Sequence, residues 1–85
     1  MTIEDWRAKI DALDQRLLDL LSERTRCVIA IGKIKNAQNL EIFDPDREQQ
    51  VIRNILRENK GPLDDAALQR IFEAVIDESR RIEKK

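Results

Sequence analysis

The stretch from Asp5 to Asn36 reads DWRAKIDALDQRLLDLLSERTRCVIAIGKIKN and carries a helical pattern without interruption. Its apolar residues recur at alternating steps of three and four, which is the spacing of a helix that packs along one seam. Arg24 occupies a seam position that should be apolar, and a buried guanidinium without an anionic partner is costly, so we expect an anionic group to meet it. The seam consists of Ile3, Trp6, Ile10, Leu13, Leu17, Leu20, Arg24, Cys27, Ile31 and Ile34.

The length of this helix predicts an assembly. At about 1.5 Å per residue, the helix is roughly 48 Å long. A compact domain of this chain length has a radius of gyration of only about 12 Å, so one copy of the chain cannot cover the seam. Pairing with a second copy is the simplest solution, and we therefore expect an obligate dimer.

The composition indicates a single all-α domain. The chain has 85 residues, of which 41% are hydrophobic and 39% charged, with few aromatic residues, and this balance suits amphipathic helices. Because 16 basic residues are scattered among 17 acidic ones, we expect neither nucleic acid nor a membrane surface as a partner. A secretory signal pattern and a membrane-spanning run are both missing, which predicts a cytoplasmic location.

The residue types also limit the chemistry. Cys27 is the single cysteine and the chain has no His and no Tyr. An intrachain disulfide, a cysteine-based metal site, a nucleophilic triad and imidazole catalysis are therefore excluded, and we expect no metal or cofactor. The seam position of Cys27 predicts a small buried hydrophobe. An enzyme built on this chain would work through charge and hydrogen bonds from Arg, Lys, Glu, Asp and Ser.

A second helix is predicted after a loop at residues 36–43. Asp44 is its expected N-cap, with Pro45 at the first helical position and acidic residues in the first turn. The segment Asn59-Lys60-Gly61-Pro62 predicts its end, with a glycine C-cap. Its apolar face consists of Val51, Ile52, Ile55 and Leu56.

A third helix is expected to begin near Asp64 or Asp65. Ser79 and Glu83 follow Val75 at steps of four, so polar side chains replace apolar ones at the end of its inward stripe. On periodicity alone, fraying near the end of the chain explains this as well as a functional site does. The predicted buried stripe consists of Leu68, Ile71, Phe72, Val75, Ile76 and Ile82.

Arg24 and Lys35 are the first candidates for a site. They lie eleven residues apart, which places them on one side of the long helix, roughly 16 Å from each other. Their long side chains can converge on a small anion. Arg7 lies about 25 Å from Arg24 along the helix axis, too far to reach the same ligand. In a dimer with opposed long helices, it could reach the partner's site instead.

Five motifs stand in order along the chain: WRAKIDALD at 6–14, LLDLLSER at 17–24, IGKIK at 31–35, DPDRE at 44–48, and the late Ser79. Together they resemble the all-helical, AroQ-type chorismate mutases, and they cover nearly the whole chain. The resemblance implies an intertwined helical homodimer of three-helix chains, with two equivalent sites that convert chorismate to prephenate.

The resemblance also implies roles for the residues nearest the reaction. Arg24 and Arg7 of the partner subunit would hold the two carboxylates of chorismate. Lys35 would contact a carboxylate and the breaking ether oxygen. Glu83 would make the second contact to that oxygen, although some members carry Gln there. A carboxylate would repel the oxygen as it gains negative charge, so Glu83 would work protonated and activity would fall as pH rises.

The remaining roles concern the ring and a carboxylate. Glu48 and the backbone at Asp44 would hold the ring hydroxyl. Arg47 and Ser79 would support a carboxylate directly or through water. Taken alone, Arg47 is more simply a surface charge, Glu48 a first-turn residue that suits the helix dipole, and Asp44 a plain N-cap.

Other functions remain open on the sequence. An isochorismate pyruvate lyase on the same scaffold would use the same cations, and a regulatory domain would bind chorismate or prephenate without turnover. A helical dimerisation domain without a ligand is a further alternative, against which Arg24 in the seam argues. The resemblance implies that residues 1–85 form one mutase domain, either a whole protein or part of a fusion with a shikimate-pathway or prephenate-processing enzyme.

Overall fold

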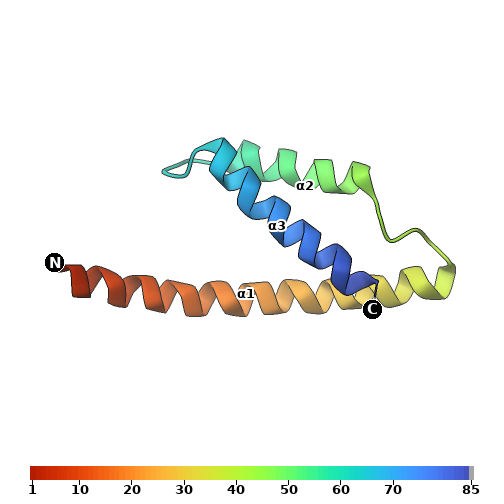
Figure 1. The fold of residues 1–85 in the computed structure, drawn as a ribbon, viewed down its shortest axis with the longest axis horizontal. Coiled ribbons are helices and arrows are strands. Elements are labelled where there is room, and N and C mark those ends of the chain that lie inside the picture. Colours follow the sequence, from red (N-terminus) through yellow and green to blue (C-terminus); the bar gives the residue numbers. More distant parts are fainter. Residues whose placement is uncertain (85) are drawn as a thin grey trace.

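The computed structural model describes residues 1–84, which form three α-helices joined by two loops (Figure 1). Helix α1 spans Ile3–Gln38, α2 spans Pro45–Glu58 and α3 spans Asp65–Glu83. Residues 1–84 contain no strand, so the predicted all-α class with one very long helix is confirmed. None of these helices is long and apolar enough to cross a lipid bilayer.

Both ends of α1 are capped. The Thr2 hydroxyl accepts a hydrogen bond from the backbone N–H of Asp5 at 3.1 Å, and the Asp5 carboxylate accepts one from the backbone N–H of Thr2 at 2.8 Å, which forms a capping box. At the other end, Asn39 adopts the left-handed conformation with φ 55°. The helix therefore ends at Gln38, inside the segment 36–43 that was predicted to be a loop.

The starts of α2 and α3 are the predicted ones. The Asp44 carboxylate accepts a hydrogen bond from the backbone N–H of Arg47 at 3.1 Å, and Asp64 caps α3 through the N–H of Ala67 at 2.7 Å. The predicted glycine C-cap of α2 is wrong. The cap is Asn59 in an extended conformation, and Gly61, with φ 75°, belongs to the loop beyond it.

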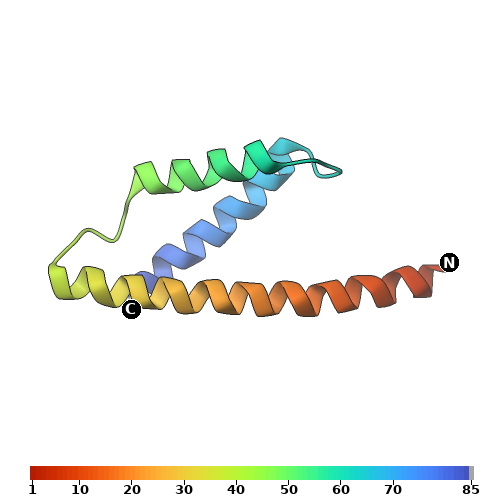
Figure 2. The same cartoon turned by 180° about the vertical axis from the view of Figure 1, so that it is seen from behind.

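Helix α3 packs against both of the other helices. It leaves the end of α2 and runs diagonally back, so that its C-terminal end meets the C-terminal half of α1, while α2 packs on α3 (Figures 1 and 2). Gly32 permits the close approach, because a Cβ at this position would lie 3.2 Å from both the Cα and the carbonyl oxygen of Glu83. The contact places the last turn of α3 directly on α1.

The core of the described chain is small. Val28 of α1 and Ile76 of α3 are its only buried hydrophobic side chains within residues 1–84. The chain measures 54 × 24 × 16 Å, and its radius of gyration of 15.9 Å exceeds the roughly 12 Å of a compact domain. The seam stays largely uncovered, and its large exposed members include Trp6, Ile10, Leu13, Leu17, Leu20, Ile31 and Ile34.

The single chain leaves exposed two residues that the sequence predicts to be buried, and one of them, Cys27, belongs to the uncovered seam. Cys27 is exposed, because α3 contacts the face of α1 that carries Val28 and Gly32, not the face that carries Cys27. Ile71 is 49% exposed, although its neighbours in the predicted stripe are buried or half-buried. The buried stripe of α3 in the single chain is therefore narrower than the apolar stripe that its sequence predicts.

Candidate active site

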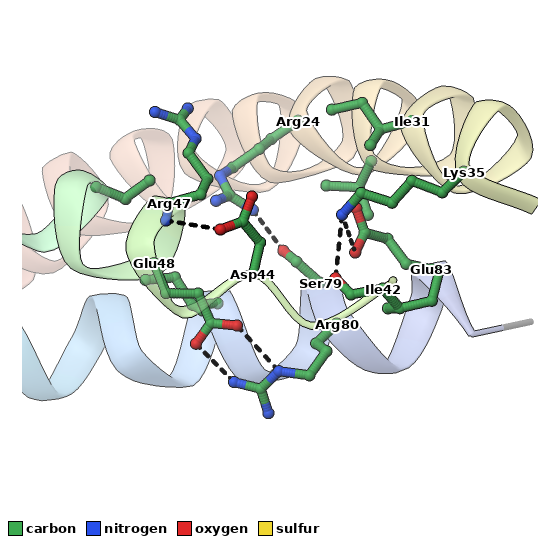
Figure 3. Close-up of a pocket in the computed structure, with 13 residues that line it drawn as sticks. Arg24, Ile31, Lys35, Ile42, Asp44, Arg47, Glu48, Ser79, Arg80 and Glu83 are labelled. Carbon is green, nitrogen blue, oxygen red and sulfur yellow. Dashed lines mark hydrogen bonds and ion pairs between the residues drawn. The ribbon is translucent and has the colours of Figure 1, made fainter. Parts of the chain in front are cut away.

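A cavity of about 300 Å³ lies where α1, the α1–α2 loop, α2 and α3 meet (Figure 3). Apolar side chains form part of its wall, among them Val28, Ile31 and Ile76. Arg7 does not line the cavity. The other predicted site residues all do, although they come from three helices and a loop: Arg24, Lys35, Asp44, Arg47, Glu48, Ser79 and Glu83.

Lys35 and Glu83 form the part of the cavity nearest the end of α3. The Lys35 ammonium donates a hydrogen bond to the Ile42 carbonyl at 3.0 Å and lies 3.5 Å from the Glu83 carboxylate. Both side chains are largely buried, with 18% and 13% exposed. Gly32 lies one turn before Lys35, so the close contact of Glu83 with α1 creates this pair. An ammonium has three N–H donors, so one donor of Lys35 remains for a ligand.

Arg24 and Ser79 form the next part of the cavity. The Arg24 guanidinium donates a hydrogen bond to the Ser79 hydroxyl, which in turn donates to the Val75 carbonyl at 2.8 Å. The hydroxyl proton is thus used within α3, and Ser79 serves as an acceptor that orients Arg24. We expected an anionic partner for Arg24, but within residues 1–84 its partner is this neutral hydroxyl. Most N–H donors of the guanidinium remain for an anionic ligand.

Asp44 and Arg47 come from the start of α2. The Asp44 carboxylate caps α2, and its carbonyl accepts a hydrogen bond from the backbone N–H of Glu48 at 3.1 Å, so its backbone N–H is the donor left for a ligand. Arg47 is exposed, and its guanidinium donates to the side-chain oxygen of Gln50 at 2.7 Å on the same helix. This hydrogen bond occupies a single donor of Arg47 at the edge of the cavity.

Glu48 pairs with Arg80, a cavity residue that the sequence analysis missed. Arg80 Nε donates to one carboxylate oxygen at 3.0 Å and NH2 donates to the other at 2.7 Å. Hydrogen bonding to Glu48 raises the pKa of Arg80 above its ordinary value. Arg80 follows Ile76 by four residues on the inward side of α3, and this spacing was the available signal.

The charges of the cavity favour an anionic ligand. Its four cationic side chains exceed its three carboxylates by one. Two of the cations, Lys35 and Arg80, are paired with Glu83 and Glu48, whereas Arg24 contacts a neutral group. Residues 1–84 contain no group of three or more Asp, Glu or Cys side chains placed to hold a metal ion. The arrangement suits a small organic anion held by N–H donors against an apolar wall.

Comparison with other sequences gives a family match over residues 6–84, described as chorismate mutase type II. A bifunctional chorismate mutase/prephenate dehydratase of Stutzerimonas stutzeri is 36% identical over 83 residues, which are 92% of this chain and 23% of that protein. The chain spans about a quarter of the length of such bifunctional relatives. A chorismate mutase of Methanocaldococcus jannaschii is 30% identical over 85 residues, which are 96% of this chain and 84% of that protein.

Solved structures give the same similarity. A chorismate mutase of Thermus thermophilus superposes with a TM-score of 0.95 at 31% identity, covering 98% of this chain and 94% of that one. A chorismate mutase of Helicobacter pylori, solved in complex with prephenate, superposes with a TM-score of 0.88 at 33% identity, covering 96% and 89%.

Proposed function

Because the chain belongs to the chorismate mutase type II family, we propose that it converts chorismate to prephenate in the cavity between α1, α2 and α3. The observation that supports this most directly is the convergence of Arg24 and Lys35, both with free N–H donors, on one cavity with an apolar wall. The proposal covers residues 1–85 as a mutase domain, alone or in a longer protein, and a cytoplasmic location.

The reaction matches a site without His, metal or cofactor. It is an intramolecular Claisen rearrangement, in which an ether bond breaks and a carbon–carbon bond forms without proton transfer. The site must fold the enolpyruvyl arm over the ring and stabilise the negative charge that grows on the ether oxygen. Lys35 supplies a donor to this oxygen, and the Ile42 carbonyl holds its ammonium in place before the substrate arrives.

The other side chains hold the substrate. Arg24, oriented by Ser79, binds one carboxylate, and Arg47 supports it from the edge of the cavity. Glu48 and the backbone at Asp44 bind the ring hydroxyl. Glu83, which pairs with Lys35 in the ligand-free chain, would donate the second hydrogen bond to the ether oxygen only when its carboxyl group carries a proton.

The second carboxylate requires a partner subunit. Chorismate carries two carboxylates, whereas Arg24 is the only cation of the cavity that is not exposed and has no carboxylate partner within residues 1–84. Arg7 of the partner subunit would add a second cation for the other carboxylate. The exposed seam supports the same intertwined homodimer, since a soluble chain rarely leaves so many large apolar side chains uncovered.

Product identification tests this function. The purified chain is incubated with chorismate and with isochorismate in separate reactions, and the products are separated by chromatography. Prephenate from chorismate is the expected result. Salicylate from isochorismate, without turnover of chorismate, would instead identify a pyruvate lyase, and binding without any turnover would identify a sensor domain. An Arg24→Ala chain purified in the same way controls for mutase from the expression host.

A further inference from the structure

Arg80 is held by groups from three parts of the chain. Its guanidinium donates to both carboxylate oxygens of Glu48 on α2, at 3.0 and 2.7 Å, and to the Asp77 carboxylate on α3 at 3.3 Å. Its guanidinium carbon also lies 5.1 Å from the ring centre of Phe43 in the α1–α2 loop, within the range of a cation–π contact. Arg80 is therefore oriented before any ligand binds.

The two hydrogen bonds from Arg80 determine the orientation of the Glu48 carboxylate (Figure 3). Two parallel hydrogen bonds define both the position and the plane of a carboxylate, which a single contact does not. Each carboxylate oxygen keeps a free lone pair, so Glu48 can accept a further hydrogen bond while Arg80 stays in place. Glu48 also lines the cavity.

We propose that Arg80 is a positioning residue, which holds the Glu48 carboxylate as the acceptor for the ring hydroxyl of chorismate. This inference rests on the proposed function and adds a specificity role to it. The ring hydroxyl is not part of the breaking or forming bonds, so its hydrogen bond contributes equally to the ground state and the transition state. Loss of such an interaction raises KM and leaves kcat unchanged.

A purely structural role for Arg80 predicts something else. The Arg80 and Glu48 side chains are 29% and 26% exposed, and ion pairs in contact with solvent contribute little to stability. Removal of Arg80 should therefore leave the fold intact. A structural defect would reduce the amount of active enzyme for every substrate, whereas a positioning defect affects mainly ligands that carry the hydroxyl.

The experiment compares Arg80→Met, Arg80→Lys and a matched control, Arg81→Met. Arg81 is the next residue of α3, is exposed, and pairs with Glu78 on the same helix. We expect Arg80→Met to raise the KM for chorismate about tenfold, the loss typical of a hydrogen bond to a charged group, with kcat within about twofold. Arg80→Lys keeps the charge but cannot hold both oxygens, and should lie between the wild type and Arg80→Met.

A chorismate analogue without the ring hydroxyl supplies the second measurement. Arg80→Met also removes a positive charge from the cavity, so its inhibition constant for this dianionic analogue should rise, but by a much smaller factor than the KM for chorismate, and it should be unchanged in Arg81→Met. The inference is overturned if Arg80→Met leaves the KM for chorismate at the wild-type value, lowers it, or weakens binding of the analogue by the same factor. Failure of the wild-type chain to convert chorismate would refute the proposed function itself, so the two failures are distinguishable.

Discussion

Lys35 combines burial, a backbone acceptor and an adjacent carboxylate, which makes it the side chain of the cavity best placed to stabilise developing charge. Removing a preorganised donor to an oxyanion typically costs about 10²–10³ in rate. We therefore expect Lys35→Ala to lower kcat by this factor in steady-state assays. Lys33→Ala is the matched control, because Lys33 is exposed on the same helix and lies outside the cavity. A near-normal kcat for Lys35→Ala would exclude Lys35 from the site.

Glu83 can donate a hydrogen bond to the ether oxygen only when its carboxyl group carries a proton. If Glu83 has this proposed role, its protonated form is the active one, so activity should be highest at low pH and should decline as pH rises. The amide of Gln donates at every pH, and we expect Glu83→Gln to stay active and to flatten the alkaline decline of kcat/KM. A profile of the native chain that is flat between about pH 5 and 9, or a decline that Glu83→Gln leaves unchanged, would argue that Glu83 is not the donor.

At the scale of elements, the contact between α1 and α3 depends on Gly32. In an open helix, Gly→Ala stabilises by about 1 kcal/mol. At Gly32 the added Cβ would lie 3.2 Å from the Glu83 backbone, so we expect Gly32→Ala to lower the free energy of unfolding by about 1–3 kcal/mol, as overpacking does. Denaturant titration measures this change in the free energy of unfolding. An increase instead of a decrease would mean that α3 moves away from α1 at little cost.

The same contact predicts an effect on catalysis. If α3 shifts away from α1, Glu83 moves relative to Lys35, and the two proposed donors to the ether oxygen lose their common geometry. A decrease in kcat should therefore accompany the lower stability of Gly32→Ala.

The ends of the helices were predictable where local chemistry determines them. Asp44 and Asp64 cap α2 and α3 as their sequences indicate, because the capping side chain and its N–H partner are only three residues apart. The predicted cap at the end of α2 was wrong, because Gly61, with its positive φ, lies in the loop beyond the C-cap residue Asn59. A glycine in sequence does not reveal which of several loop positions needs it.

Long-range placement was less predictable. The resemblance to the chorismate mutases predicted seven residues that line the cavity. Arg80 was missed, because its partner Glu48 lies 32 residues away and no local pattern connects the two. The exposure of Cys27 and Ile71 has a related cause. A period of three and four residues identifies an apolar face, but it does not say which neighbour covers that face.

At the scale of the whole molecule, the shared site predicts complementation. Arg7→Ala and Arg24→Ala chains should each be inactive, since each homodimer lacks one of the two arginines in both sites. Mixing the two should restore activity, because one site of the heterodimer combines Arg24 of the Arg7→Ala chain with Arg7 of the Arg24→Ala chain. Activity after subunit exchange, compared with unmixed samples, measures this. No recovery after verified exchange, or an active monomer in sedimentation, would contradict the shared site.

The uncovered seam of α1 also has a kinetic consequence. Isolated helical segments are marginal in water, and the N-terminal half of α1 exposes Trp6, Ile10 and Leu13 by 53–55% in the single chain. Its docking then has to await an encounter between two chains, which makes the return of activity from denaturant a second-order process at low concentration. Doubling the protein concentration should halve the time to half-recovery, and a time that does not change with concentration would mean that each chain reaches its active structure alone.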